Sequence, residues 1–173
     1  MIYRFCSKLI IKNKPKTIIP FLKKKFKNIS YKKIIKQNLH TEEISNHVAI
    51  IAKNKKVREI VNQLQMKIIK SNNKICVEGR DIASKILVKN PKYDIAFYFK
   101  CSLNVAAYRR WVDLKKSVPL KDVKKSLRLR TYFDKNRKNS PLIKVKDAIL
   151  IRTDKLSKKQ VLDKMTKYIE KMN

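Results

Sequence analysis

Three short apolar runs of strand length constrain the fold of this chain more than any other feature. They are KICVEG at 74–79, DIAFYFKCS at 94–102 and DAILIRT at 147–153. The second and third are followed by stretches with helical periodicity, LNVAAYRRWVDLKK at 103–116 and LSKKQVLDKMTKYIEKM at 156–172. A strand followed by a helix, repeated along a chain, is typical of a parallel sheet with flanking helices. The sequence therefore predicts an α/β fold.

The part of the chain before these runs is predicted to be mainly helical. Pro15 and Pro20 are expected to divide residues 5–27 into short helices, and a short strand or loop is expected over 28–39. Thr41 is a plausible helix start. The helix after it is expected to reach a turn near Asn54, and a second helix then runs to the polar residues at 71–73. Residues 41–70 are thus predicted to form a helix pair.

The charge of the chain leaves two explanations open. The 45 Lys and Arg residues against 13 Asp and Glu give a formal charge of +32, which favours a polyanionic partner such as RNA, DNA or a nucleotide. Only nine of these cations are arginine, and the abundance of Lys with a single Gly is also what an AT-rich coding sequence produces. Residues 1–41 contain no acidic residue, a feature shared with organelle transit peptides.

Cysteine, histidine and hydropathy patterns give no sign of a metal site or a membrane span. The three cysteines have neither CxxC spacing nor a neighbouring histidine pair, so they are expected to pack as small apolar residues. His40 and His47 are expected to be surface or capping residues. Lysines interrupt every apolar run before the roughly 18 residues that a span requires. We therefore expect a soluble, cytoplasmic monomer with no membrane partner and no metal bound by the chain itself.

Arginine positions provide the first indication of a ligand. Among so many lysines, an arginine that is retained is expected to hold a phosphate or carboxylate bidentately. Helical spacing places Arg130, Asp134 and Arg137 on one face, which suits a nucleotide but equally a surface salt bridge. Residues 78–81 follow the first predicted strand, where ligands bind in open α/β sheets.

Several motifs in one register resemble those of bacterial cytidylate kinases. EGRDIAS at 78–84 is similar to the family's (D)GRD(I/M)GT, and DKNRKNSPL at 134–142 is similar to its D-x-N-R-x-x-(A/S)-P-L. The resemblance runs from Tyr3 to the C-terminus and also includes the shorter motifs TEEISN, VRE and AAYRR. It implies a P-loop nucleoside monophosphate kinase fold in a single domain over 1–173, missing the first strands. The monophosphate-binding subdomain would cover about 28–70 and the lid 115–141.

The resemblance implies ATP-dependent phosphorylation of CMP and dCMP, with Mg²⁺ accompanying ATP. It assigns cytosine recognition to Arg58 and Asp81, the CMP phosphate to Arg4 and Arg80, the ribose to Arg130 and Asp134, and phosphate contacts in the lid to Arg137. Arg130 and Arg137 would also stabilise the charge that moves with the phosphoryl group, since positioning and electrostatics dominate this reaction. Ala49, Phe133 and Lys135 depart from the residues usual in the family.

The phosphate loop of such kinases is expected to be absent from these 173 residues. The motif G-x-x-x-x-G-K-(S/T) needs two glycines, and Gly79 is the only one. Met1 falls inside a family motif, so we expect a misassigned start or a degraded gene, a chain inactive in this form, and poor stability where central strands are lacking. The alternatives are a non-catalytic basic protein that binds RNA or a nucleotide on a kinase scaffold, and a regulatory protein that binds CMP.

Overall fold

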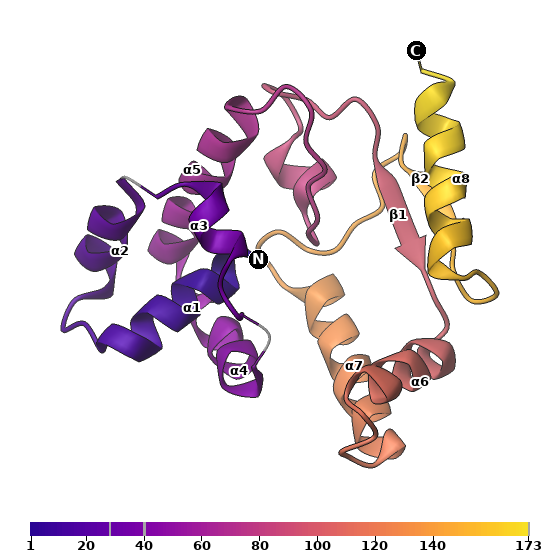
Figure 1. Ribbon diagram of the computed structural model, residues 1–173, viewed down its shortest axis with the longest axis horizontal. Coiled ribbons are helices and arrows are strands. Elements are labelled where there is room, and N and C mark those ends of the chain that lie inside the picture. The colour runs from indigo at the N-terminus through magenta and orange to yellow at the C-terminus, as the bar shows by residue number, and fades with distance from the viewer. Residues whose placement is uncertain (28, 40, 173) are drawn as a thin grey trace. The chain divides into compact units, whose positions relative to one another are not determined.

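The chain forms two compact units in a computed structural model that describes residues 1–27, 29–39 and 41–172 (Figure 1). The N-terminal unit comprises Met1–Cys76 and the C-terminal unit Val77–Asn173. Both predicted classes of element are present, since helices occur in each unit and the C-terminal unit holds a parallel sheet. None of the described helices is long and apolar enough to cross a membrane.

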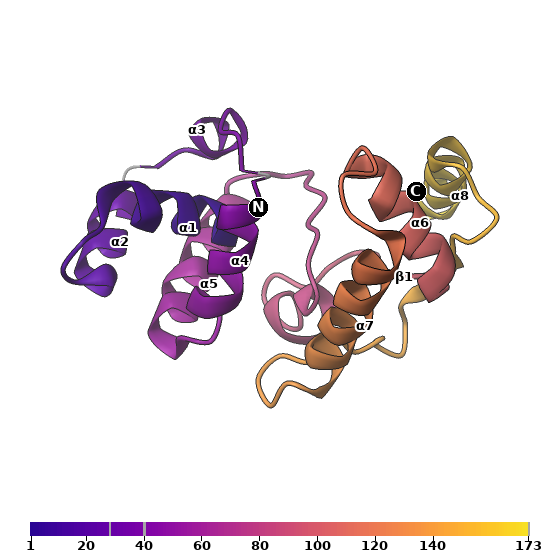
Figure 2. The same cartoon turned by 90° about the horizontal axis from the view of Figure 1, so that it is seen from below.

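The N-terminal unit consists of helices. They are α1 (Ile2–Asn13), α2 (Ile18–Lys27), α3 (Tyr31–Ile35), α4 (Glu42–Ile51) and α5 (Lys55–Lys70). Helix α1 packs against α4 and α5, and α2 packs against α5, as the indigo and purple ribbons show in two views (Figures 1 and 2).

The helix pair predicted for residues 41–70 is confirmed, and local capping explains where its members begin. The Thr41 hydroxyl accepts a hydrogen bond from the Ile44 amide at 3.3 Å, and the Asn54 side chain accepts one from the Val57 amide at 3.1 Å. Such side-chain acceptors satisfy amides that have no partner within the first turn of a helix. The end predicted at 71–73 is also confirmed, because α5 stops at Lys70.

Two predictions for the first 39 residues are wrong in part, although residues 29–30 and 36–39 lie outside helices as expected. Pro20 does not divide a helix, since it lies in the first turn of α2, where a missing N–H breaks no helical hydrogen bond. Pro15 does separate α1 from α2. Residues 31–35 form the short helix α3 instead of a strand or loop, because Ile34 packs fully into the core of the unit. Asn28, part of the same prediction, lies outside the described residues.

A continuous apolar core holds the N-terminal unit together. Cys6, Leu22 and Ile34 have no exposed surface, and the rings of Phe5 and Phe26 stack with centroids 6.2 Å apart. Burial raises the pKa of the Cys6 thiol to about 12, so it stays protonated and packs as a small apolar side chain. The prediction that the cysteines pack as small apolar residues is therefore confirmed for Cys6 and wrong for Cys76, which is exposed.

The C-terminal unit contains a parallel two-stranded sheet with helices. Strands β1 (Phe97–Lys100) and β2 (Ile149–Arg152) pair with Phe97 opposite Ile149. The other elements are the π-helix η1 (Ile82–Ile86), α6 (Leu103–Asp113), α7 (Leu120–Asn136) and α8 (Lys158–Glu170). Helix α6 packs on α7, and Tyr168 of α8 meets Phe97 edge to face at 6.2 Å. The α/β class and both strand-then-helix predictions are confirmed.

The first predicted strand is not formed. Residues 75–79 have no regular secondary structure, and no described strand pairs with them. Ile75 is 41% exposed, so the apolar run is only partly buried. An apolar run becomes a strand only when a neighbouring strand satisfies its N–H and C=O groups. In the described structure β1 and β2 pair with each other, and neither pairs with this run.

A hydrogen bond between Tyr93 and Asp147 joins the segments that lead into β1 and β2. The Tyr93 hydroxyl donates to Asp147 Oδ1 at 2.6 Å. This bond raises the pKa of Tyr93 to about 12 and lowers the pKa of Asp147. The free energy of unfolding of the sheet region should therefore depend on pH through the ionisation of Tyr93 and of Asp147.

We expect Tyr93 to ionise near pH 12, measured as the difference in tyrosinate absorbance between the wild type and Tyr93→Phe. Because the folded pKa of Tyr93 exceeds its usual 10, the stabilisation is complete below pH 10 and is lost as pH rises through about 12. Because the folded pKa of Asp147 is lowered from 3.8, its contribution is present above that value and is lost as pH falls through the folded pKa. A midpoint at the ordinary tyrosine value would contradict the bond.

Candidate functional site

Three arginine side chains converge on the Asp134 carboxylate. Arg80 Nε lies 3.0 Å from Oδ2, Arg130 Nε lies 3.9 Å from the same oxygen, and Arg137 Nη1 lies 4.0 Å from Oδ1. The Asp134 side chain is 19% exposed, whereas the three guanidinium groups are more exposed. We call these four residues the Asp134 cluster. The spacing prediction is confirmed for Arg130 and Asp134, which lie one turn apart on α7, whereas Arg137 reaches Asp134 from just beyond the end of the helix.

The end of α7 and the loop after it position Asp134 and Arg137. Helix α7 ends at Asn136, and Arg137 continues in an extended conformation. The chain then turns back, so that the Leu142 amide donates to the Asp134 carbonyl at 2.7 Å. Arg137 Nε donates to the Ser140 carbonyl inside this turn, and Ser140 adopts a left-handed φ of 55°. The motif at 134–142 therefore runs from the last turn of α7 into a loop that folds back onto the helix end.

Gly79 allows the backbone before Arg80 to pack closely. A Cβ atom at residue 79 would lie 2.6 Å from Ile82 Cγ1, closer than side chains tolerate. The next residues lead into η1, where the Asp81 carbonyl accepts hydrogen bonds from the Lys85 amide at 2.8 Å and the Ile86 amide at 3.2 Å. The Asp81 carboxylate forms none of the described salt bridges.

Arg4 and Arg58 belong to the N-terminal unit. Arg4 Nη1 donates to the Leu39 carbonyl and to Ser45 Oγ, both at 2.9 Å, which ties α1 to the start of α4. Arg58 lies half-buried in the first turn of α5. The sequence did not predict Leu39 and Ser45 as partners of Arg4, although Ser45 stands in the TEEISN motif that signalled this region.

The charge of the Asp134 cluster suits an additional anion. One carboxylate cannot neutralise three guanidinium groups, so the cluster keeps a formal excess of two positive charges. Exposed pairs of this kind contribute little to stability, so holding three like charges together is not explained by stability alone. A guanidinium can hold a phosphate through two parallel hydrogen bonds. The arrangement can therefore bind a phosphate beside Asp134, whose carboxylate can accept from a hydroxyl group.

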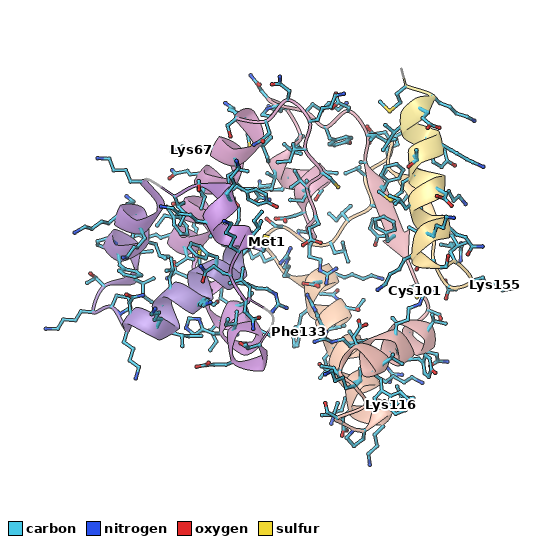
Figure 3. All side chains as sticks on the ribbon, viewed as in Figure 1. Met1, Lys67, Cys101, Lys116, Phe133 and Lys155 are labelled. Atoms are coloured by element: carbon cyan, nitrogen blue, oxygen red, sulfur yellow. The ribbon has the colours of Figure 1, made fainter. Side chains whose placement is uncertain are left out.

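Phe133 stands where arginine often occurs in the kinases that the sequence resembles, and this difference changes the surface of α7. Phe133 is labelled on this helix in Figure 3. Its side chain is 64% exposed, and its ring centroid lies 5.8 Å from that of Tyr132. An aromatic ring cannot form the bidentate contacts that a guanidinium would form at this position. Lys135, the next departure, is exposed near the end of the helix.

The described residues contain no group of three or more His, Cys, Asp or Glu side chains that could hold a metal ion. Mg²⁺ is usually held by one or two carboxylates together with substrate phosphates. We therefore assign no residue of this chain to the metal. His47 is half-buried within α4 and caps no helix, contrary to the prediction, and His40 lies outside the described residues.

Arg109 has a structural role that the sequence did not reveal. Its Nη2 atom donates to the carbonyls of Thr153 at 2.8 Å and Leu156 at 3.1 Å. Asp154 in the same turn accepts from the Ser102 amide at 2.7 Å. The Ser102 side chain and then this amide lower the pKa of the Asp154 carboxyl. These contacts fix the turn between β2 and α8 against the start of α6.

Comparison with known proteins shows one consistent similarity. The family model described as Cytidylate kinase matches residues 8–171. A cytidylate kinase of Clostridium botulinum strain Okra is 34% identical over 142 residues, covering 80% of this chain and 64% of that protein. A probable cytidylate kinase of Vairimorpha ceranae is 33% identical over 132 residues, covering 76% and 59%. The cytidylate kinase of Rickettsia africae is 30% identical over 136 residues, covering 77% and 61%. The chain thus spans less than two thirds of these relatives.

Proposed function

Because the chain belongs to the cytidylate kinase family, we propose that it takes part in ATP-dependent phosphorylation of CMP and dCMP by supplying the site for the acceptor nucleotide. The observation that carries this proposal is the Asp134 cluster, in which three arginines surround one carboxylate. The two motifs that resemble the family most closely, at 78–84 and 134–142, contribute Arg80, Asp134 and Arg137, and Arg130 lies one helical turn before the second motif.

The cluster supports separate roles for its members. Arg80 and Arg137 would hold phosphate oxygens through charged hydrogen bonds, and the Asp134 carboxylate would accept from a ribose hydroxyl. Arg130 would contact the ribose and, with Arg137, stabilise charge as the phosphoryl group moves. Within the cluster Asp134 partly neutralises the three arginines. An arriving phosphate would therefore meet guanidinium groups that are already gathered in place.

The remaining acceptor-site residues are proposed from the motifs that contain them. Arg58 and Asp81 would recognise the cytosine base, and Arg4 would hold the phosphate together with Arg80. Arg4 already donates to Ser45 and to the Leu39 carbonyl, which fixes its guanidinium plane on α1. Fixed side chains lose less conformational entropy when a ligand binds.

We assign no donor site to these 173 residues. A loop that wraps the ATP phosphates needs glycines where successive backbone N–H groups approach the phosphate, and Gly79 is the only glycine. ATP and its Mg²⁺ would supply the phosphoryl group and part of the charge neutralisation in the complete reaction. We therefore propose that this chain by itself binds the acceptor without transferring phosphate.

Titration calorimetry of the 173-residue chain with CMP and with cytidine tests the proposal. We expect CMP to bind at least about tenfold more tightly than cytidine, because charged hydrogen bonds to phosphate contribute about 1.5 to 3 kcal/mol. The same preparation with CMP, ATP and Mg²⁺ is expected to form no CDP.

Two outcomes would contradict the proposal. Equal affinities for CMP and cytidine would show that the arginines do not recognise the phosphate. CDP formation above the uncatalysed background would show that the chain holds a donor site after all. Titration with AMP is the matched control for base recognition, since AMP has the same ribose phosphate as CMP and differs from it in the base.

A further inference from the structure

The N-terminal 41 residues have an unusual charge distribution. They carry 12 of the 45 Lys and Arg residues and none of the 13 Asp and Glu residues. A coding bias towards lysine would raise the number of cations along the whole chain, but it gives no reason for carboxylates to be missing from one segment. This segment forms α1, α2 and α3 of the folded N-terminal unit.

A groove in this segment combines lysines with apolar walls. It lies between α1 and the region of α3 and has a volume of about 450 Å³. Its lining residues are Phe5, Lys8, Leu9, Lys12, Ile29, Lys33, Lys36 and Gln37. The groove therefore presents four ammonium groups around an apolar surface and no carboxylate.

The lysines of the groove differ in how they are held. Lys8 Nζ donates to Gln37 Oε1 at 2.9 Å and to the Asn38 carbonyl at 3.3 Å. These bonds connect α1 to the segment that follows α3. Lys12, Lys33 and Lys36 are exposed, and no carboxylate in the described part of the chain forms a salt bridge with them. These three residues, which we call the groove lysines, can therefore meet an anion without first breaking an ion pair.

We propose that this groove binds single-stranded nucleic acid through its phosphates. A chain of phosphates releases counterions when several lysines contact it, which favours a polyanion over a single phosphate. The apolar walls suit a single strand, whose unstacked bases expose apolar faces, better than a duplex, whose bases are stacked inside. The inference depends on the N-terminal unit only, so it stands apart from the proposed role of the Asp134 cluster.

Fluorescence anisotropy of a labelled 20-nucleotide single-stranded RNA with the full chain tests this inference. The test variant replaces the three groove lysines with glutamine, leaving Lys8 intact. The matched control replaces Lys159, Lys164 and Lys167 of α8 with glutamine, which removes the same charge. We expect at least a tenfold loss of affinity for the groove variant and less than about a threefold loss for the control. The slope of log affinity against log salt should become shallower by about 2 in the groove variant.

Several results would overturn the inference. Equal losses in both variants would mean that only net charge matters. Failure of the wild type to bind, or tighter binding to duplex RNA or to phosphatidylserine vesicles than to the single strand, would exclude the proposed ligand. If the circular dichroism of the glutamine variant shows a loss of helix, a variant with arginine at the same three positions is tested in its stead. It keeps the charge and is expected to bind within about threefold of the wild type, and a larger loss with intact helices also counts against the groove.

Discussion

Replacement of Arg80 by alanine is expected to weaken CMP binding by about 10- to 100-fold, because hydrogen bonds between charged groups contribute about 1.5 to 3 kcal/mol. The Arg80 guanidinium lies 3.0 Å from Asp134 and stands in the cluster with Arg130 and Arg137. Without it the excess positive charge falls by one unit and a phosphate loses one of its holders. Titration calorimetry with CMP measures the change.

The matched control for this prediction is Arg128→Ala. Arg128 is an exposed arginine on α7 that forms none of the described salt bridges, so CMP affinity should change less than about twofold. Arg80→Lys keeps the charge but lacks the planar fork, and we expect it to bind CMP with intermediate affinity. CMP affinity that is the same in all four proteins would remove Arg80 from the acceptor site. The melting temperature of Arg80→Ala should stay close to that of the wild type, because the broken ion pair is partly exposed.

Leu22→Ala is expected to lower the free energy of unfolding by about 2 to 5 kcal/mol, the range measured when a buried leucine leaves a cavity. Leu22 is 0% exposed on α2 and belongs to the apolar core that joins the helices of the N-terminal unit. Because α2 is held to the unit mainly through its contact with α5, the loss should affect that packing directly. Urea unfolding followed by circular dichroism measures the effect.

Ile50→Ala provides the comparison for Leu22. Ile50 is an aliphatic residue of similar size, 65% exposed on α4, and its replacement should change stability by no more than about 0.5 kcal/mol. If both variants lose the same stability, the core described for the N-terminal unit is not what holds α2 in place.

The sequence was sufficient where local chemistry decides the structure. Thr41 caps the helix that it was predicted to start, and Asn54, predicted to lie in the turn, caps the next one. A side chain that reaches an amide three residues ahead needs no distant partner. The pairing of Asp134 with Arg130 could likewise be predicted, because residues four apart are neighbours on a helix. Arg137 pairs with Asp134 from an extended residue just beyond the helix, which the spacing did not indicate.

Contacts between distant segments could not be derived in this way. Arg80 and Asp134 lie 54 residues apart, and only the family resemblance suggested that they belong to one site. The run at 74–79 has the composition of a strand, but pairing depends on backbone groups elsewhere in the chain. Helix α3 depends on the burial of Ile34, which periodicity over five residues does not reveal.

The loop that closes between Asp134 and Leu142 has a consequence for how this segment can change during evolution. Its backbone hydrogen bond fixes the number of residues between its ends, whereas most side chains within it face no such geometric demand. Substitutions at Lys135 or Lys138 leave the ring size intact. An insertion or deletion of one residue between Asp134 and Leu142 would alter it. In related sequences we therefore expect the number of residues between Asp134 and Leu142 to vary less than the identity of those residues.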